Sequence, residues 1–293
     1  MRLATYDYQG QQRLGVVAGG YIADVSAAVS SMLALVEGGA DALAAAQAEA
    51  DRATDRLALG QVRLLSPFPR PKKNILCLGV NYRAHGEEAL RALAPHRSYQ
   101  PPKHPVWFTK AVTSVCGPYD DIELDLGLSQ KYDWEAELAV VIGREGRHIP
   151  KEHAFEYVHS YTVFNDFSVR DFQLDHGGQW FLGKSLDRAS PMGPWLVTPD
   201  ELGDPGNLRI SCRVNGVTKQ NANTSELIFD VPAVIADISQ ILTLEPGDVI
   251  STGTPAGVGL GRTPQEWLKP GDVMETEIER IGTLRNRMVA SYR

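Results

Sequence analysis

Hydrophobic and polar positions alternate over the first 23 residues, in RLATYDY (2–8) and RLGVVAG (13–19). A period of two is typical of half-buried strands, so this alternation predicts short strands joined by the polar turn between them. From Asp24 to about Leu57 the chain is rich in Ala, Leu, Glu and Gln, which predicts helix, with a break at Gly38-Gly39.

Three prolines in SPFPRPKK (66–73) then interrupt both patterns. Proline restricts its own backbone and that of the preceding residue, so this stretch is the expected linker. We therefore predict a small N-terminal α/β domain over residues 1–70 and a second domain over residues 71–293.

The second region reads mainly as short strands separated by turns. NILCLGV (74–80) has the character of a buried strand, residues 81–94 that of a short helix, and residues 95–105 form a proline-rich loop. Beyond that loop only residues 227–242 have clear helical character. The expected class is α+β, mainly β, without the alternating rhythm of a doubly wound sheet.

One predicted strand carries acidic residues in an apolar setting, KYDWEAELAVVIG (131–143). Residues two apart in a strand share a face, so Trp134 and Leu138 would line one side and Glu135 and Glu137 the other. Two like charges this close repel each other unless they are solvated, share a proton or are neutralised by a cation. The strand alone leaves these alternatives open.

Composition narrows the functional classes. The net charge is −7 and no basic block is larger than RPKK (70–73), which argues against nucleic-acid binding. No apolar run approaches the roughly 18 residues of a membrane span, and the N-terminus has no apolar segment typical of a signal peptide. Three widely spaced cysteines fit neither a disulfide framework nor a zinc site, so we expect a reducing, cytoplasmic location.

A third acid offers an explanation for the paired glutamates. Asp166 ends the β-rich stretch YTVFND (161–166), and with Glu135 and Glu137 it would form an all-oxygen ligand set. Hard cations such as Mg²⁺ favour such ligands, with water or substrate oxygens completing the coordination. The alternative is a solvated polar strand face, with Asp166 capping a turn.

His85 and Glu88 form a second candidate pair. Residues three apart on a helix are neighbours, so Glu88 could orient His85 as a general base. A surface helix pair is the plainer interpretation of the same spacing.

Further candidates could bind an anionic substrate. Lys184, in GKSLDR, could bind an anion or stabilise a developing oxyanion, although it could equally be a surface lysine. Arg170 and Gln173, with Gln179 further on, could hold a distal carboxylate, or Arg170 could pair with Asp171 or Asp187.

The segment STGTPAGVGLG (251–261) lacks the signatures of a phosphate loop and of a dinucleotide fingerprint. Its backbone N–H groups and Thr254 could instead form a nest for a carboxylate.

These segments together resemble the fumarylacetoacetate hydrolase family over about residues 70–290. The resemblance rests on motifs that occur in order: LGVNYRAHGEE, WFTKAVTSVCGP around Lys110, YDWEAELAVVIG, YTVFNDFSVRD, WFLGKSLDRASPMGPW and LTLEPGDVISTGTPAGVG. It implies the family's mixed β-roll, a homodimer, and a metal, usually Mg²⁺ with Mn²⁺ or Ca²⁺ as alternatives. The implied ligands are Glu135, Glu137 and Asp166.

The resemblance also implies His85 and Glu88 as a catalytic dyad on a lid segment, Lys184 as an active-site lysine, and Thr254 in a loop that binds the substrate carboxylate. We expect an Mg²⁺-dependent hydrolase that cleaves the C3–C4 bond of 2,4-dioxo acids such as acylpyruvate, fumarylpyruvate or maleylpyruvate, as in the catabolism of aromatic compounds. The alternative is a metal-dependent decarboxylase or isomerase of a 2-oxo dicarboxylate such as oxaloacetate. A non-enzymatic β-rich binding module is a third interpretation.

Overall fold

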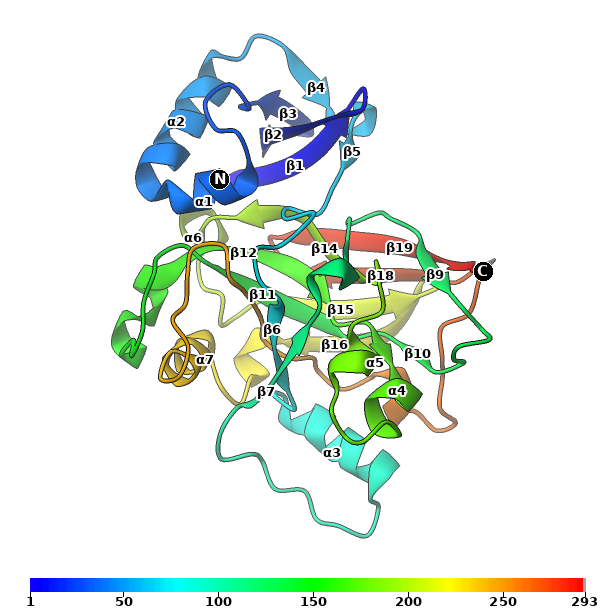
Figure 1. The fold of residues 1–293 in the computed structure, drawn as a ribbon. Coiled ribbons are helices and arrows are strands. Elements are labelled where there is room, and N and C mark those ends of the chain that lie inside the picture. Colours follow the sequence, from blue (N-terminus) through cyan, green and yellow to red (C-terminus); the bar gives the residue numbers. More distant parts are fainter. Residues whose placement is uncertain (292–293) are drawn as a thin grey trace.

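The N-terminal region is an antiparallel meander flanked by two helices. In the computed structural model, which describes residues 1–291, strands β1 (Arg2–Tyr8), β2 (Gln11–Ala18) and β3 (Tyr21–Asp24) pair in sequence, as the alternation predicts. Two short strands, β4 (Arg56–Ala58) and β5 (Arg63–Leu64), pair with β3 and β1. Figure 1 shows this region in blue at one end of the molecule.

The helical stretch predicted from Asp24 to Leu57 is shorter than expected. It consists of α1 (Met32–Glu37) and α2 (Gly39–Arg52). Ser31 caps the first helix by accepting a hydrogen bond from the Ala34 N–H at 3.1 Å. The break falls at the predicted glycines because Gly39 has a φ of +54°, which glycine adopts without strain.

The central sheet joins strands that are far apart in the sequence. Its order is β1–β14–β12–β11–β17–β6–β7, and the pairs are antiparallel except for β17 with β6. The bounds are β6 (Ile75–Gly79), β7 (Val106–Lys110), β11 (Ala136–Ile142), β12 (Val158–Asn165), β14 (Ser190–Val197) and β17 (Val249–Ser251), with β8 (Val115–Cys116) beside β14. Since β1 bonds to β14, the sheet runs across residue 70, and the division there stays a prediction.

A second sheet packs against the first and encloses the main core. Its order is β16–β15–β18–β19–β9, with bounds β9 (Ile122–Leu124), β15 (Arg209–Val214), β16 (Val217–Asn223), β18 (Val273–Ile278) and β19 (Gly282–Ala290). Leu138 and Val140 of β11 lie in one apolar cluster with Ile210 and Met274 of this sheet. Two short strands, β10 (Tyr132–Asp133) and β13 (Ser168–Val169), pair with each other. Along the chain, β10 comes just before β11 and β13 just after β12.

Helices are few and short, which confirms the α+β, mainly β class. The helix expected at residues 81–94 is α3 (Arg83–Leu93), and that expected at 227–242 is limited to α7 (Val231–Ile238), capped by Asp230. Three short helices were not predicted: α4 (Arg170–Leu174), α5 (Phe181–Lys184) and α6 (Pro199–Leu202). Single 3₁₀ segments are η1 (Leu59–Gln61), η2 (Val112–Ser114), η3 (Lys151–Tyr157), η4 (Thr224–Glu226) and η5 (Gly259–Gly261).

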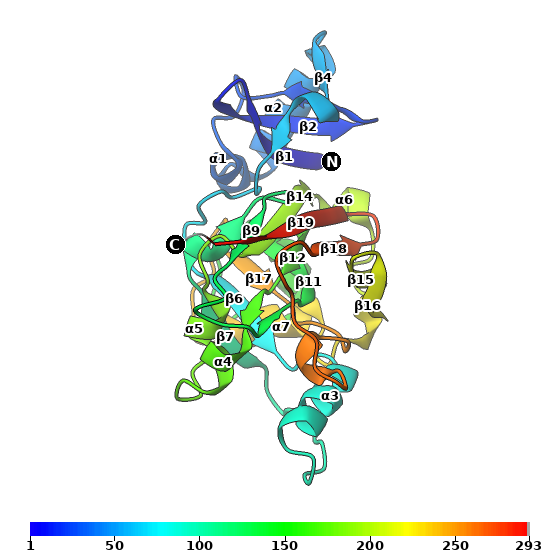
Figure 2. The ribbon, with the colours of Figure 1, turned by 90° about the vertical axis from the view of Figure 1, so that its right-hand side faces the viewer.

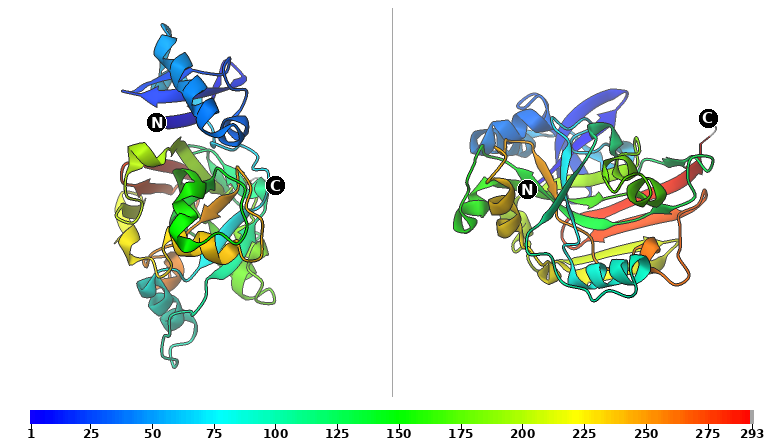
Figure 3. Two further views of the ribbon diagram at one scale, coloured as in Figure 1. Left: turned by 90° about the vertical axis from the view of Figure 1, so that its left-hand side faces the viewer. Right: turned by 60° about the horizontal axis from the view of Figure 1, so that its bottom comes forward.

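Helix α3 lies at the end of the molecule opposite the N-terminal region. Figure 2 shows this separation along the long axis of the molecule, and the right-hand view of Figure 3 looks toward the end where α3 (cyan) lies. Within residues 1–291, no helix has the length and apolar character needed to cross a membrane.

Candidate active site

The three predicted acids come together inside the protein. Glu135 directly precedes β11, Glu137 lies within it, and Asp166 directly follows the neighbouring strand β12. The Asp166 N–H donates to the Glu135 carbonyl at 2.8 Å, which fixes the two chain segments side by side. One carboxylate oxygen from each acid lies within 4.8 Å of the others, and the residues are only 4%, 1% and 0% exposed. The solvated polar face is therefore wrong.

Two buried lysines neutralise part of this acidic cluster. Lys184 Nζ lies 2.7 Å from Glu135 Oε2 and 2.8 Å from Asp166 Oδ2. Lys110 Nζ lies 2.6 Å from Asp166 Oδ1 and donates to the Phe167 carbonyl at 2.9 Å. Lys184 is 2% exposed and so is not a surface lysine. Lys110 was given no role from the sequence, although it stands in one of the motifs, WFTKAVTSVCGP.

Arg170 is bound to acidic residues other than those considered from the sequence. Its Nε donates to Asp133 Oδ2 at 2.7 Å, and one terminal nitrogen lies 2.6 Å from Glu135 Oε1. The other terminal nitrogen donates to Gln173 Oε1 at 2.8 Å. Pairing with Asp171 or Asp187 does not occur, because the side chain points back from α4 toward β10 and the start of β11.

The glycine-rich segment binds carboxylates of the protein itself. Ser251 Oγ and the Gly253 N–H donate to Glu137 Oε2 at 2.6 and 2.8 Å. Thr254 is buried there, donating to the Ala136 carbonyl at 3.0 Å and accepting from Gln220 at 2.7 Å. The segment thus binds the Glu137 carboxylate without using Thr254, and binding of a substrate carboxylate by Thr254 stays a prediction.

Further along, the same segment holds two more carboxylates. The Gly257 N–H lies 3.0 Å from both oxygens of Glu88. The N–H groups of Gly259 and Leu260 donate to Asp133 at 2.6 and 3.0 Å.

The charges around the acids favour unequal protonation. Burial opposes ionisation of Glu135, but Lys184 and then Arg170 outweigh it and hold the pKa of this carboxyl well below its usual value. Burial, followed by the negative charges of Asp166 and Glu135, raises the pKa of Glu137 well above its usual value. The cluster is thus short of positive charge at Glu137.

A divalent cation fits this shortage. Glu137 Oε1 is buried and has no hydrogen-bond partner within residues 1–291, a costly state for a carboxylate oxygen. Four buried carboxylates, those of Asp133, Glu135, Glu137 and Asp166, face three buried cations, those of Lys110, Arg170 and Lys184. The donors offered by the three acids are all oxygen, the type that Mg²⁺, Mn²⁺ and Ca²⁺ prefer.

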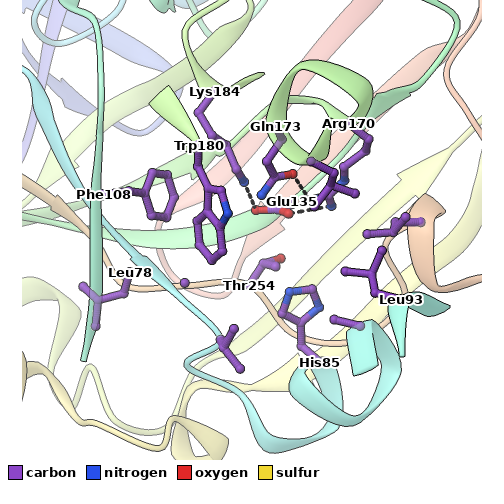
Figure 4. A pocket seen from close by; sticks show the side chains of 15 residues that line it. Leu78, His85, Leu93, Phe108, Glu135, Arg170, Gln173, Trp180, Lys184 and Thr254 are labelled. Carbon is purple, nitrogen blue, oxygen red and sulfur yellow. Dashed lines mark hydrogen bonds and ion pairs between the residues drawn. The ribbon is translucent and has the colours of Figure 1, made fainter. Parts of the chain in front are cut away.

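The predicted dyad lies on α3, and its His85 faces the same space as Glu135. His85 Nδ1 lies 3.6 Å from Glu88 Oε2, and both residues are 7% exposed, so they are not a surface pair. Figure 4 shows the His85 ring directed from α3 toward the region of Thr254 and Glu135.

A cavity of about 590 Å³, a volume that includes space open to solvent, lies between α3 and Glu135. Its polar lining is His85, Glu135, Arg170, Gln173, Lys184 and Thr254. Apolar side chains cover the flanks, with Phe108 and Trp180 packed edge to face at 5.3 Å between ring centroids. The exposed side chain of Gln179 is not part of this lining, whereas the other predicted substrate-binding residues are.

Comparison with known proteins identifies the class that this fold and site define. Residues 74–289 match the family model described as fumarylacetoacetate (FAA) hydrolase C-terminal, so the chain belongs to that family. Among its relatives, the mitochondrial oxaloacetate tautomerase Fahd2a of Rattus norvegicus is 42% identical over 92% of this chain and 85% of that protein. The oxaloacetate tautomerase YisK of Bacillus subtilis is 43% identical over 78% of this chain and 74% of that protein.

Solved structures share the whole architecture. A fumarylacetoacetate hydrolase from Exiguobacterium antarcticum superposes with a TM-score of 0.85 at 39% identity, covering 99% of this chain and 100% of that one. Maleylpyruvate hydrolase from Sphingobium sp. SYK-6, in complex with manganese(II) and pyruvate, gives a TM-score of 0.82 at 32% identity with the same coverage. The family's β-roll fold, expected from the resemblance, is confirmed.

The expected hydrolase activity is wrong. Relatives 42–45% identical to this chain are oxaloacetate tautomerases, which are isomerases and not hydrolases of carbon–carbon bonds. They support the alternative, an isomerase acting on a 2-oxo dicarboxylate. The role in aromatic catabolism depends on the hydrolase activity and loses its basis with it. The motifs could not separate the two reactions, because the hydrolase and isomerase hypotheses assign a 2-oxo acid to the same acids and dyad.

Proposed function

We propose that this protein is a metal-dependent keto–enol tautomerase of oxaloacetate. The observation that carries the proposal is that the cavity is lined by the imidazole of His85 and by Glu135, one of three buried carboxylates that lie within 4.8 Å of one another. The activity of relatives that are 42–45% identical supports oxaloacetate as the substrate.

Glu135, Glu137 and Asp166 would hold the cation, with Mg²⁺ as the expected ion and Mn²⁺ or Ca²⁺ as alternatives. The manganese in the maleylpyruvate hydrolase complex supports a divalent ion in this fold. When bound, such an ion withdraws electron density from the C2 oxygen and so favours the enolate form of a 2-oxo acid.

Tautomerisation moves one proton from the enol oxygen at C2 to carbon C3, and no atom enters or leaves overall. His85 is the side chain suited to this transfer, because an imidazole gives and takes protons near neutral pH. Glu88 would orient the ring through Nδ1, at the observed 3.6 Å.

The remaining polar groups would bind and orient the substrate. The ammonium of Lys184 would stabilise negative charge on the C2 oxygen. Gln173 and Thr254 would contact the substrate carboxylates. Arg170 would act on the substrate mainly by holding Glu135 in place, since its nitrogens already contact Asp133, Glu135 and Gln173.

Proton exchange at C3 tests the proposal directly. Oxaloacetate in D₂O would be followed by proton NMR with metal-loaded protein, with protein treated with EDTA, and without protein. We expect the loaded protein alone to accelerate deuterium entry at C3 without forming pyruvate or CO₂. Exchange at the spontaneous rate, or exchange only in step with CO₂ release, would refute the tautomerase.

We also propose a homodimer and retain the cytoplasmic location as a prediction. Apolar side chains of Tyr119, Leu126 and Leu128 are 46–52% exposed on one stretch of the chain and could be covered by a second copy. Light scattering at micromolar concentration should give about twice the 32.1 kDa of one chain. A monomer mass would argue against the dimer.

A further inference from the structure

One buried carboxylate, that of Asp133 in β10, has no role in the reaction proposed above. It is fully buried and accepts four hydrogen bonds. Oδ1 accepts from the N–H groups of Trp134 at 2.9 Å and Gly259 at 2.6 Å. Oδ2 accepts from the Leu260 N–H at 3.0 Å and from Arg170 Nε at 2.7 Å. Each oxygen therefore faces two donors.

On one side, Asp133 fixes a metal ligand through Arg170. The planar guanidinium binds Asp133 through Nε and reaches Glu135 Oε1, at 2.6 Å, through a terminal nitrogen. Because a guanidinium is rigid, the position of Asp133 determines where that nitrogen meets Glu135.

On the other side, Asp133 fixes the loop that holds the dyad. Gly259 and Leu260 are bound to Asp133, and two residues earlier the Gly257 N–H is bound to Glu88. Gly261 has no room for a side chain, because a methyl group there would overlap the Glu88 side chain. The loop thus packs directly on the α3 residue that orients His85.

We propose that Asp133 is a positioning residue that couples helix α3 to the metal ligand Glu135. The connection runs from Glu88 through the loop 257–261 to Asp133, and from there through Arg170 to Glu135. Metal binding and the seating of α3 then stabilise each other, because a coupling free energy between two sites is reciprocal. The metal assignment in this inference rests on the proposed function.

The chemistry of the site requires a carboxylate at this position. An amide would keep the shape of Asp133, but whichever way it is oriented, its NH₂ group faces two donors. Two of the four hydrogen bonds would be lost and replaced by repulsion. Asp133→Asn is therefore a nearly isosteric change that breaks the connection.

The test uses Mn²⁺ alone, without substrate. Calorimetric titration gives its Kd, and hydrogen–deuterium exchange of residues 83–93 is measured with and without saturating Mn²⁺. In the wild type, Mn²⁺ should slow exchange in α3. In Asp133→Asn, the Kd should rise by about 5-fold or more and the Mn²⁺-dependent slowing should disappear.

Asp248→Asn is the matched control. Asp248 is also a buried aspartate (4% exposed), but it binds Lys73 Nζ at 3.0 Å and the Glu245 N–H at 2.9 Å, away from the acids. This variant should keep both the wild-type Kd and the Mn²⁺ response of α3. The inference is overturned if folded Asp133→Asn also keeps both.

A second variant tests the connection from its other end, in case Asp133→Asn does not fold. Gly261→Ala displaces Glu88, whose side chain supplies the three atoms nearest to the added methyl group. Gly60→Ala, where a methyl group meets no neighbour within 4 Å, is its control. Gly261→Ala should raise the Kd for Mn²⁺ and Gly60→Ala should not; an unchanged Kd in Gly261→Ala would overturn the coupling. Since no readout uses oxaloacetate, failed tautomerisation would refute the proposed function and leave this inference standing.

Discussion

The N-terminal region and the rest of the chain treat charged residues differently. Within residues 1–70 the buried polar side chains are Thr5 and Ser66, and no charged side chain is buried. Ion pairs there lie at the surface, such as Arg13 with Asp24 at 2.8 Å, with side chains 32% and 34% exposed. In the region that matches the family, by contrast, the side chains of Lys110, Arg170 and Lys184 are buried together with several carboxylates.

The difference shows which region is built for stability and which for chemistry. An exposed ion pair contributes up to about 1 kcal/mol, so the N-terminal region depends little on its charges. Buried charges are expensive to desolvate, and an apolar core of the same volume is often at least as stable. The enclosed charges of the second region are therefore best explained by what they bind.

The largest effect should come from breaking the enclosed cluster at Asp166. Asp166→Ala leaves Lys110 and Lys184 short of a partner, and removing one member of a buried pair typically costs about 3–5 kcal/mol. Urea unfolding should show this loss, together with loss of Mn²⁺ binding. Asp24→Ala is the counterpart in the N-terminal region and should cost no more than about 1 kcal/mol. Equal costs would contradict the comparison.

Within the second region, His85 should separate activity from stability. His85→Ala removes the proposed proton-transfer group, which is typically worth about 10²–10⁴-fold in rate, but no metal ligand. Oxaloacetate tautomerisation should fall by that factor while Mn²⁺ affinity stays near wild type. His153→Ala, at an exposed histidine paired with Glu156, should change neither quantity. If His85→Ala stays within a few-fold of wild type, His85 is not the proton-transfer group.

Metal removal should affect the region with enclosed acids more than the N-terminal region. A ligand present at 100 times its Kd stabilises the folded state by about 2.7 kcal/mol, so the melting temperature should fall with EDTA and recover with Mg²⁺ or Mn²⁺. Exchange protection in β1 to β3 should change less than protection in β11 and β12. An Asp166→Ala protein that still responds to the metal would exclude this ligand set.

The smallest effect concerns the Arg13–Asp24 pair and its pH dependence. Although burial opposes it, hydrogen bonds from Ser26 and Arg13 hold the pKa of Asp24 below its ordinary value of 3.8. The charged carboxylate therefore stabilises the protein above that value, and this contribution is lost as the pH falls through the lower folded-state pKa. Asp24→Asn should be less stable by at most about 1 kcal/mol at pH 7. The melting temperatures of the wild type and Asp24→Asn should converge as the pH falls below 3.8. A difference that stays constant with pH would contradict this assignment.

Local pattern predicted the longer elements and the shared face of Glu135 and Glu137, but not the short helices. Alternation in residues 131–143 placed Glu137 on the strand face opposite Leu138. In the structure Leu138 lies in the core between the two sheets, whereas Ala139, which shares a face with Glu137, lies in a separate apolar cluster. Helix α3 was predicted because residues 81–94, which include His85 and Glu88, have a continuous helical pattern. Short helices such as α5 were missed because four residues give no period to detect.

Partners of the buried charges could not be predicted, because they depend on contacts between distant segments. Lys110 meets Asp166 from β7, and Arg170 meets Asp133 across the short β10–β13 pair. Nothing around Asp133 in the sequence indicates that it accepts hydrogen bonds from residues 259 and 260. The glycine-rich segment did indicate carboxylate binding, but not that the carboxylates would be the protein's own.

The position of β17 between β11 and β6 has a consequence for biosynthesis. Strand β17 pairs with β6, through Ile250 and Leu76, and also with β11. It leads into the loop that binds Glu137, Glu88 and Asp133, and it leaves the ribosome long after both of its neighbours. Pairing across so long a stretch carries a large loop-closure entropy and slows folding. Until that strand inserts, β6 and β11 are exposed edges and Glu137 lacks its donors Ser251 and Gly253, so a growing chain is most in need of chaperones before residues 249–253 emerge.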